Sequence, residues 1–352
     1  MKKDIGFLAV GQAGGNIGRL FESQGFNVMY VNTSMEDLRT LTNAKHIYHI
    51  AGGEGAARDR DRARELLIAD IQDLQIEISR TFTEEFIFVV FSAGGGTGSG
   101  TAPTIMTFLN DIIPESKICG VTILPAANES LKTQANAFEC FAELEKYDEE
   151  DKLDLSSLFV IDNNGKPNKI LLNETFADLF MKMLRIPGFT DPRGNIDVMD
   201  LKDTLSAKGC AMISALPAEL SSTPKLIDSF KNGIFARQDD RMVQYIALSM
   251  ASEINTDAFI KVIGKPYDMF QGYNRDASVC VLSGLNLPYS RIEGIKDLIS
   301  EEQTELKKVW DAKKPTLLQN SIDLSFMRKN HKPKVIKNPD DVISLFSRGG
   351  RG

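Results

Sequence analysis

The residues best suited to chemistry in this chain are Gly94–Gly100, which read Gly-Gly-Gly-Thr-Gly-Ser-Gly. An unbroken apolar run, Phe86–Phe91, precedes them and is typical of a strand buried on both faces. Thr101–Pro103 follows and predicts a helix start, because proline in the first turn costs no hydrogen bond. Glycines at such a junction let backbone N–H groups converge on an anion, and the helix dipole adds positive charge. The stretch therefore predicts a phosphate site, with further donors from the hydroxyls of Thr97 and Ser99.

Two common phosphate loops do not fit this stretch. No Gly-Lys-[Ser/Thr] follows at P-loop spacing, and G-x-G-x-x-G fails because the required position is Ser99. A plain flexible linker is the alternative, but linkers do not separate a core strand from a helix start. We favour phosphate binding.

The first half of the chain alternates strand and helix patterns. Strands are expected at Ile5–Val10, Val28–Asn32, Ile47–Ile50, Phe86–Phe91, Ile118–Leu124 and Leu158–Ile161, and helices at Gly14–Ser23, Arg58–Arg80, Ala102–Ile112 and Glu129–Lys146. Repeated strand–helix units predict a Rossmann-like parallel sheet covered on both faces. Ligand loops of such a sheet gather at the carboxyl ends of its strands.

Other loops at that edge carry suitable groups. A second glycine-rich phosphate contact follows the first strand and contains Gly11, Gln12, Gly14, Gly15 and Asn16. A third loop, with Gly53, Glu54 and Gly55, follows the Ile47–Ile50 strand. Asn163 follows the last strand and offers an amide to a base edge, although Asn163–Gly165 also fits a plain turn. Together these loops predict a nucleotide pocket.

The second half predicts a central helix and a mixed α/β domain. The helix at Asn168–Leu184 is apolar around much of its girth, which predicts burial of Ile170, Leu171, Phe176, Leu179, Phe180 and Met183. Strands are expected at Cys210–Ala215, Met242–Ser249, Met269–Tyr273 and Ser278–Leu282, and helices at Pro224–Phe235, Thr256–Ile263 and Tyr289–Trp310. We expect a nucleotide-binding domain at 1–167, a connecting helix at 168–187, a second α/β domain at 188–286, a C-terminal helix at 287–312 and a tail at 313–352.

An acidic segment lies just beyond the central helix. Asn195, Asp197 and Asp200 could orient and polarise a water for attack on a phosphate, or they could simply cap a helix start. A helix of about 17 residues at 1.5 Å per residue carries this segment roughly 25 Å from the pocket. These groups would then reach the nucleotide of a second molecule stacked head to tail. Such a contact does not close into a ring and continues as a filament.

Composition and charge narrow the class of protein. The chain has 42% apolar and 25% charged residues and no membrane-spanning run. A strand pattern starts at Ile5, with no signal peptide before it. We therefore expect a soluble, cytoplasmic protein. Its four cysteines lack metal-site spacing and predict buried, reduced thiols. The chain has a net charge of −7, yet residues 313–352 hold nine Lys/Arg against three Asp. A basic tail on an acidic body predicts an anionic partner.

Over residues 1–312 the chain resembles the tubulin/FtsZ superfamily. Gly94–Gly100 matches its signature phosphate loop, Gly11–Asn16 its first glycine loop, and Asn32–Ser34 with Asp37 its second nucleotide loop. The resemblance implies GTP or GDP, Mg²⁺ and hydrolysis triggered by polymerisation, without assigning a protein ligand to the metal. It implies nucleotide contacts from Gly11, Gln12, Gly14, Gly15, Asn16, Asn32, Gly53, Glu54, Gly55, Gly94, Gly95, Gly96, Thr97, Gly98, Ser99, Glu129 at the ribose, Asn163 at the guanine and Phe176 stacked on the base. It makes Asn195, Asp197 and Asp200 the co-catalytic loop that enters the neighbouring subunit's site.

Three departures separate the chain from FtsZ. The FtsZ arginine after the ribose-contacting Glu is replaced by Thr133, and its central-helix Asn by Phe180, which leaves Asn173 as the candidate for that Asn's base contact. The third loop, Gly52–Arg58, lacks the FtsZ pattern. With Met269–Asn274 and the basic tail, these departures resemble TubZ, the plasmid- and phage-borne branch. That likeness implies filaments that segregate DNA without direct membrane contact. It also implies a TubR-like DNA-binding adaptor on a centromere-like site, bound by Arg328, Lys329, His331, Lys332, Lys334 and Lys337.

Other functions stay open at this stage. Asp340–Arg348 loosely resembles the terminal peptide by which FtsZ binds membrane adaptors, which keeps a cell-division role as the alternative. A monomeric dinucleotide enzyme would need a fingerprint that the Gly11–Gly15 loop lacks. An interaction protein without turnover would not need Asn195, Asp197 and Asp200. A solvated tail that only aids solubility is the alternative to the adaptor-binding role.

Overall fold

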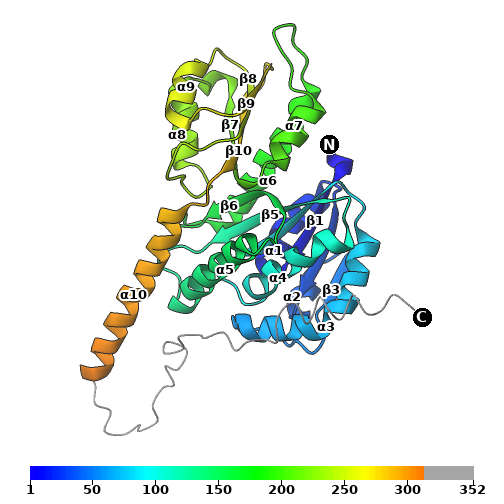
Figure 1. Cartoon of the computed structure of the whole chain (residues 1–352), viewed down its shortest axis with the longest axis vertical. Helices are drawn as coiled ribbons and strands as arrows, with labels where there is room; N and C mark the ends of the chain where they lie inside the picture. Colours follow the sequence, from blue (N-terminus) through cyan, green and yellow to red (C-terminus); the bar gives the residue numbers. More distant parts are fainter. Residues whose placement is uncertain (313–352) are drawn as a thin grey trace. The chain divides into compact units, whose positions relative to one another are not determined.

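Ten strands of the described residues, 1–312, form one continuous sheet in a computed structural model of the protein (Figure 1). Their order is β3-β2-β1-β4-β5-β6-β7-β10-β8-β9. The strands are β1 Ile5–Val10, β2 Asn27–Asn32, β3 His46–His49, β4 Phe86–Ser92, β5 Lys117–Leu124, β6 Leu155–Asp162, β7 Gly209–Pro217, β8 Tyr245–Met250, β9 Asp268–Tyr273 and β10 Ala277–Leu285. The helices are α1 Gly11–Ser23, α2 Met35–Arg39, α3 Arg60–Thr81, α4 Thr97–Ile112, α5 Leu131–Glu149, α6 Lys169–Leu184, α7 Val198–Ser206, α8 Thr223–Asn232, α9 Thr256–Ile263 and α10 Tyr289–Ala312.

The first six strands are parallel to their neighbours, as predicted. All six residues of β1 are buried, and so are the first six of β4. Because successive side chains of a strand point to opposite faces, full burial means that both faces of the sheet are covered. Parallel strands also bring the loops after β1, β2, β4 and β5 to one edge, where the pocket lies.

The second half continues the same sheet with mixed strand directions. β7 runs parallel to β6, whereas β10 is antiparallel to both β7 and β8, and β9 is parallel to β8. The predicted α/β fold class, with a parallel half and a mixed half, is confirmed. Residues 1–302 form one compact unit, and the domain boundaries expected within it stay a prediction.

The central helix α6 packs against α1, β7 and β10. Its residues Phe176, Phe180 and Met183 are fully buried. The expected burial of Ile170 and Leu171 is wrong, since these side chains are 71% and 56% exposed. They lie in the first turn, ahead of the stripe at i, i+4 spacing that starts at Leu172 and faces the core.

Some helix boundaries differ from the sequence expectation. α4 begins at Thr97, inside the glycine stretch, so Pro103 lies within the helix and not in its first turn. α8 ends at Asn232, and Phe235 instead forms a bridge with Ile161 of β6. The tail and its basic residues, Arg328 to Lys337, and the Asp340–Arg348 segment lie outside the described residues.

The four cysteines are free and buried, as the sequence predicts. Burial raises the pKa of Cys119, Cys140 and Cys210 to about 12, and it raises the pKa of Cys280 further. At pH 8 only about one thiol in ten thousand would then be ionised. We therefore expect the native protein to react with none of its four thiols on the minutes scale in a thiol-reagent assay, and all four to react in denaturant. Rapid reaction of the native protein would contradict this placement.

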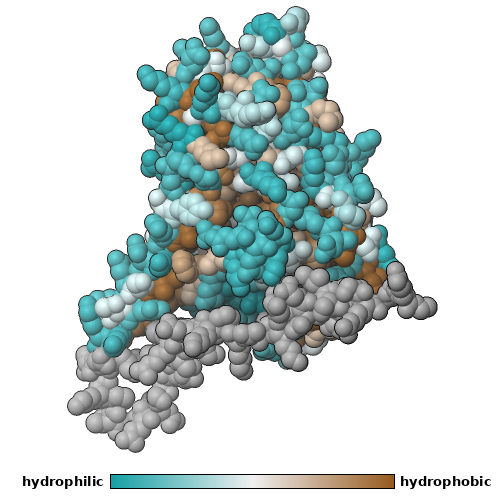
Figure 2. Space-filling view, in the orientation of Figure 1, coloured by the Kyte–Doolittle hydropathy of each residue, from teal (hydrophilic) through white to brown (hydrophobic). Residues whose placement is uncertain are grey.

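No helix among residues 1–312 is both long and apolar enough to cross a bilayer. Polar residues cover most of the face drawn in Figure 2, with apolar side chains showing between them.

Candidate functional site

A cavity of about 360 Å³ opens at the carboxyl edge of the parallel strands. It brings together segments that follow β1, β2, β3, β4 and β5. Its lining residues are Val10, Gly11, Gln12, Ala13, Ser34, Asp37, Gly55, Ala56, Ala57, Arg58, Ser92, Gly94, Gly95, Gly96, Thr97, Gly98, Glu129 and Thr133. The structure thus gathers both predicted glycine loops, part of the third loop and Glu129 around one space.

The signature loop turns directly into the first turn of α4. Gly96 is the N-cap residue, so the N–H groups of the residues that follow it have no partner within the helix. The hydroxyls are already engaged: Thr97 bonds Asn32 and Thr33, and Ser99 donates to the carbonyl of Gly95. An anion in this cavity would therefore be held by backbone N–H groups and the helix dipole, more than by these hydroxyls.

Backbone contact explains why this helix start contains glycine. A Cβ on Gly96 would lie 2.7 Å from Cα of Arg58, and one on Gly100 would lie 2.5 Å from the carbonyl oxygen of Arg60. Main-chain atoms cannot give way as a flexible side chain does. The segment before α3 is therefore packed directly onto the phosphate loop.

The second nucleotide loop supplies a carboxylate. Asn32 Nδ2 donates to Asp37 Oδ2 at 3.1 Å, and Thr33 Oγ1 lies 2.7 Å from Thr97 Oγ1, which ties this loop to the start of α4. Mg²⁺ in nucleotide sites is held by one or two carboxylates together with phosphate oxygens and waters. Asp37 in the cavity fits that donor set. No cluster of three or more acidic, His or Cys side chains suited to a metal occurs among residues 1–312.

Glu129 lines the same cavity and lies just before the start of α5. Its Oε1 accepts from the N–H of Ala126 at 3.0 Å and pairs with Lys169 Nζ at 2.7 Å. Lys169 is the first residue of α6, so this pair joins the cavity to the central helix.

Several predicted residues lie beside the cavity. Gly15 and Asn16 border a smaller neighbouring cavity that also contains Asn32 and Asp37. Gly14 is buried beneath the first loop, against the carbonyl of Val90. In the third loop, Gly53 is buried against Thr33, and Glu54 is exposed.

The two predicted base contacts differ in their surroundings. Asn163 is 8% exposed at the end of β6, and its side-chain amide has no hydrogen-bond partner among residues 1–312. Phe176 is not brought to the cavity. It is fully buried, and its ring packs against the rings of Phe21 and Phe159.

The acidic segment is also separate from the cavity of its own chain. Figure 1 shows α7 and the loop before it near the top of the view, whereas α3 and α4, which border the cavity, lie lower. Asn195, Asp197 and Asp200 are absent from its lining. Their expected separation from the pocket agrees with this placement, and their catalytic role stays a prediction.

Asp197 and Asp200 form a capping box at the start of α7. Asp197 Oδ1 accepts from the N–H groups of Met199 and Asp200, and Asp200 Oδ2 accepts from the N–H of Asp197. The remaining oxygen of each carboxylate has no hydrogen-bond partner within the described chain. The helix-capping alternative raised from the sequence is thus observed, and it leaves one oxygen of each carboxylate without a partner in this part of the chain, so the catalytic alternative stays a prediction. Asn195 is exposed, and its Oδ1 accepts from the N–H of Asp191 at 2.6 Å.

Two arginines of the site escaped sequence reasoning. Arg58 lines the cavity, and Arg60 is buried against α4 and α5. Arginines recur at every second position from 58 to 64, and that alternation predicts only a polar surface. Nothing in the pattern distinguishes an inward guanidinium from an exposed one.

Comparisons with known proteins agree with this geometry. Residues 4–165 match the GTPase domain of the Tubulin/FtsZ family. The tubulin-like protein TubZ of a Clostridium botulinum C phage is 26% identical over 359 residues, which cover 99% of both chains. The crystal structure of Clostridium botulinum phage c-st TubZ has a TM-score of 0.79 and 25% identity, over 87% of this chain and 100% of that one.

A third comparison shows the fold alone. The GTPγS-form protofilament of Bacillus thuringiensis serovar israelensis TubZ has a TM-score of 0.71 at 18% identity, over 88% of this chain and 94% of that one. The signature loop, the cavity around it and these likenesses point the same way: residues 4–165 match the GTPase domain of the Tubulin/FtsZ family, and the chain is similar to TubZ along its length.

Proposed function

We propose that the chain binds GTP in the cavity and assembles head to tail, and that the acidic segment of one subunit completes the site of the next. The observation that carries this proposal is the separation of the two halves of the chemistry. The cavity holds the phosphate loop, while the carboxylates suited to directing water sit on α7, outside it. Each subunit then carries the nucleotide-binding part of one active site and the water-directing part of another.

The exposed surface around the acidic segment supports a docking role. Val198 and Met199 lie between the two carboxylates, and Met199 is 60% exposed. Apolar side chains of this size gain free energy when a partner covers them. In the solved Bacillus thuringiensis TubZ structure, subunits form a protofilament in the GTPγS form.

Inside the cavity, each group of this chain has a task. The N–H groups at the start of α4 hold phosphate oxygens, and Asp37 is the residue that would hold Mg²⁺, which when bound would neutralise phosphate charge. Glu129 binds the ribose hydroxyls, and the free amide of Asn163 contacts the guanine. From the neighbouring subunit, Asp197 and Asp200 orient the attacking water and accept its proton, with Asn195 as a further hydrogen-bonding group.

We further propose a cytoplasmic role in positioning plasmid or phage DNA through a DNA-binding adaptor. The support for this part is the excess of Lys and Arg in residues 313–352 and the full-length likeness to a phage TubZ. The tail lies outside the described residues, so this proposal rests on charge and likeness.

The trans arrangement predicts a steep dependence of GTPase activity on protein concentration. We expect phosphate release per subunit to rise about 100-fold or more once assembly begins, because the cavity of an unassembled subunit lacks the carboxylates of a neighbour. Phosphate release and sedimentation should be measured on the same dilution series, with GTP and Mg²⁺ in excess. Full activity per subunit in samples that sedimentation shows to be unassembled would refute the shared site.

A further inference from the structure

We propose that Arg58 is the cation that binds the phosphate chain of the nucleotide. This inference rests on the proposed function, in which a guanine nucleotide fills the cavity. Arg58 lies on the segment between β3 and α3 and lines the cavity together with Gly94, Gly95 and Gly96 of the phosphate loop. The juxtaposition arises only in the fold, since the two segments are more than thirty residues apart in the sequence.

The charge of the cavity gives Arg58 its importance. Among the described residues that line it, Asp37 and Glu129 are acidic and Arg58 is the one basic residue. Lys169 offsets Glu129 at 2.7 Å, but it is not part of the lining. A phosphate chain carries several negative charges, and without Arg58 the charged side chains of the lining would all repel it. Backbone N–H groups supply partial charges, whereas Arg58 supplies a full one.

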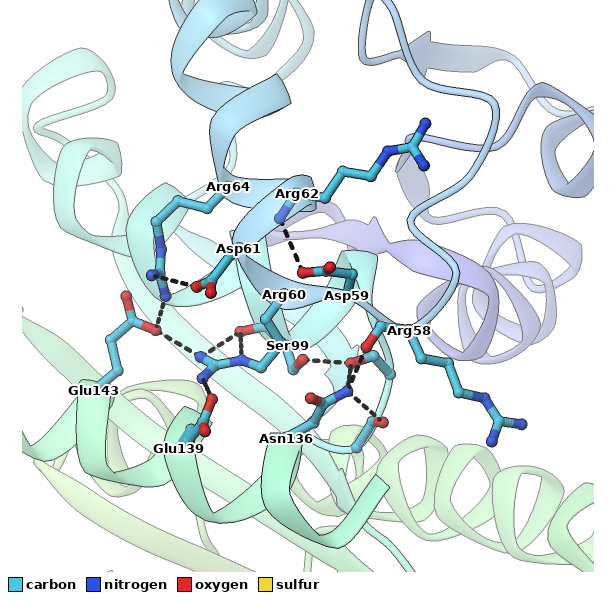
Figure 3. Close-up of polar contacts among 12 residues, drawn as sticks. Arg58, Asp59, Arg60, Asp61, Arg62, Arg64, Ser99, Asn136, Glu139 and Glu143 are labelled. Carbon is cyan, nitrogen blue, oxygen red and sulfur yellow. Dashed lines mark hydrogen bonds and ion pairs between the residues drawn. The ribbon is translucent and has the colours of Figure 1, made fainter. Parts of the chain in front are cut away.

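The backbone of Arg58 is held against the phosphate loop. Asn136 Nδ2 donates to the carbonyl oxygens of Arg58 at 3.0 Å and Gly95 at 2.9 Å, so one side chain of α5 ties the two segments together (Figure 3). Ala57 and Arg58 both have left-handed backbones, with φ of 47° and 60°. Non-glycine residues rarely adopt this conformation, and it persists where surrounding contacts enforce it, often at functional sites.

The guanidinium of Arg58 is not committed to a carboxylate. Its Nη1 donates over 3.4 Å to Ser130 Oγ and 3.5 Å to Thr133 Oγ1, both long contacts to neutral hydroxyls. No acidic side chain within residues 1–312 forms an ion pair with it, whereas Arg60 and Arg64 both pair with Glu143. Figure 3 shows the Arg58 side chain extending away from that paired cluster.

Thr133 stands where the likeness to FtsZ leads one to expect an arginine. In this chain a guanidinium approaches the Thr133 hydroxyl from another segment, the loop before α3. Arginine suits the task because its planar fork donates two parallel hydrogen bonds to phosphate oxygens and keeps its charge at all working pH values.

The test is equilibrium binding of GDP, GTPγS and inorganic tripolyphosphate to protein kept below its assembly concentration. Arg58→Ala should weaken the binding of all three by about 10- to 100-fold, the usual effect of losing a charge-assisted contact. Arg58→Lys should recover part of that loss, because it restores charge without the fork. Arg62→Ala is the matched control. It removes an exposed arginine in the first turn of α3, four residues beyond Arg58, and should change each affinity less than about twofold.

Arg58→Gly relieves the left-handed strain and serves as a second variant if Arg58→Ala unfolds at a lower temperature without ligand.

Either of two results would overturn the inference: unchanged affinities in both Arg58→Ala and Arg58→Gly, or an equal loss in Arg62→Ala. The tripolyphosphate arm separates this inference from the proposed function. If wild type binds tripolyphosphate in an Arg58-dependent way but no guanine nucleotide, the inference stands and the proposed function fails.

Discussion

Replacement of Arg60 by alanine is expected to lower the free energy of unfolding by about 2–4 kcal/mol. Arg60 is 6% exposed, and its guanidinium makes four hydrogen bonds (Figure 3). Nε and Nη2 donate to the carbonyl of Ser99 at 3.2 and 3.0 Å, Nη1 to Glu139 at 3.1 Å and Nη2 to Glu143 at 2.6 Å. Truncation would leave the buried Ser99 carbonyl and the largely buried Glu143 carboxylate short of donors, whereas the exposed Glu139 can turn to water.

The carbonyl of Ser99 lacks its usual helical donor because residue 103 is a proline. In an α-helix the N–H of residue 103 would bond the carbonyl of residue 99, and proline has no N–H to give. The Arg60 fork occupies that carbonyl instead. Helix α4, which follows the phosphate loop, can therefore contain Pro103, because the Arg60 side chain of α3 supplies the hydrogen bond that the proline cannot.

This substitution of one donor for another gives a double-mutant test. Pro103→Ala restores the backbone N–H, so it should recover about 1 kcal/mol of the loss when combined with Arg60→Ala. Urea unfolding followed by circular dichroism measures all four members of the cycle. Arg62→Ala, which removes an exposed arginine two residues further along α3, should stay within about 0.5 kcal/mol of wild type. Strict additivity in the cycle would mean that the Ser99 carbonyl does not couple the two residues.

Sequence reasoning located most elements because their signals are local. β1, β4 and β5 are apolar runs, and only strands covered on both faces use such runs. Glycine loops after strands placed the phosphate site, since their spacing relative to a strand and a helix is read along the chain. The family likeness then assigned the reaction.

The structure differs from the sequence expectation where contacts between distant segments decide a helix boundary or the direction of a side chain. The glycines of the signature loop read as a loop, yet Gly98 and Gly100 belong to α4, where the backbone of Arg60 in α3 packs onto Gly100. Phe176 shares a helix face with Phe180, so the same i, i+4 spacing that suggests a base contact also buries the ring in the core. The roles of Arg58 and Arg60 depend on which way a side chain points, and no local pattern records that.

Asp200→Asn is expected to lower GTP turnover in assembled protein by about 100- to 1,000-fold, as loss of a general base does. Asparagine keeps a side-chain oxygen that can accept from the N–H of Asp197, so the capping box of α7 and the stability of the fold should survive. Only the charge is lost, and with it the ability to take a proton from water.

Binding and assembly should behave differently from turnover in this variant. Because Asp200 lies outside the cavity of its own chain, the affinity of unassembled protein for GTP should stay within about twofold of wild type. Filaments should form and then persist, since the GTP within them is hydrolysed slowly.

Asp203→Asn, which replaces an exposed acid one turn further along α7, is the matched control and should retain normal turnover. Normal phosphate release by the Asp200→Asn filaments, or a parallel loss in Asp203→Asn, would mean that the water is activated by some other group. The remaining carboxylate of that segment, Asp197, would then be the residue to replace, because it too keeps one oxygen free at the exposed start of α7.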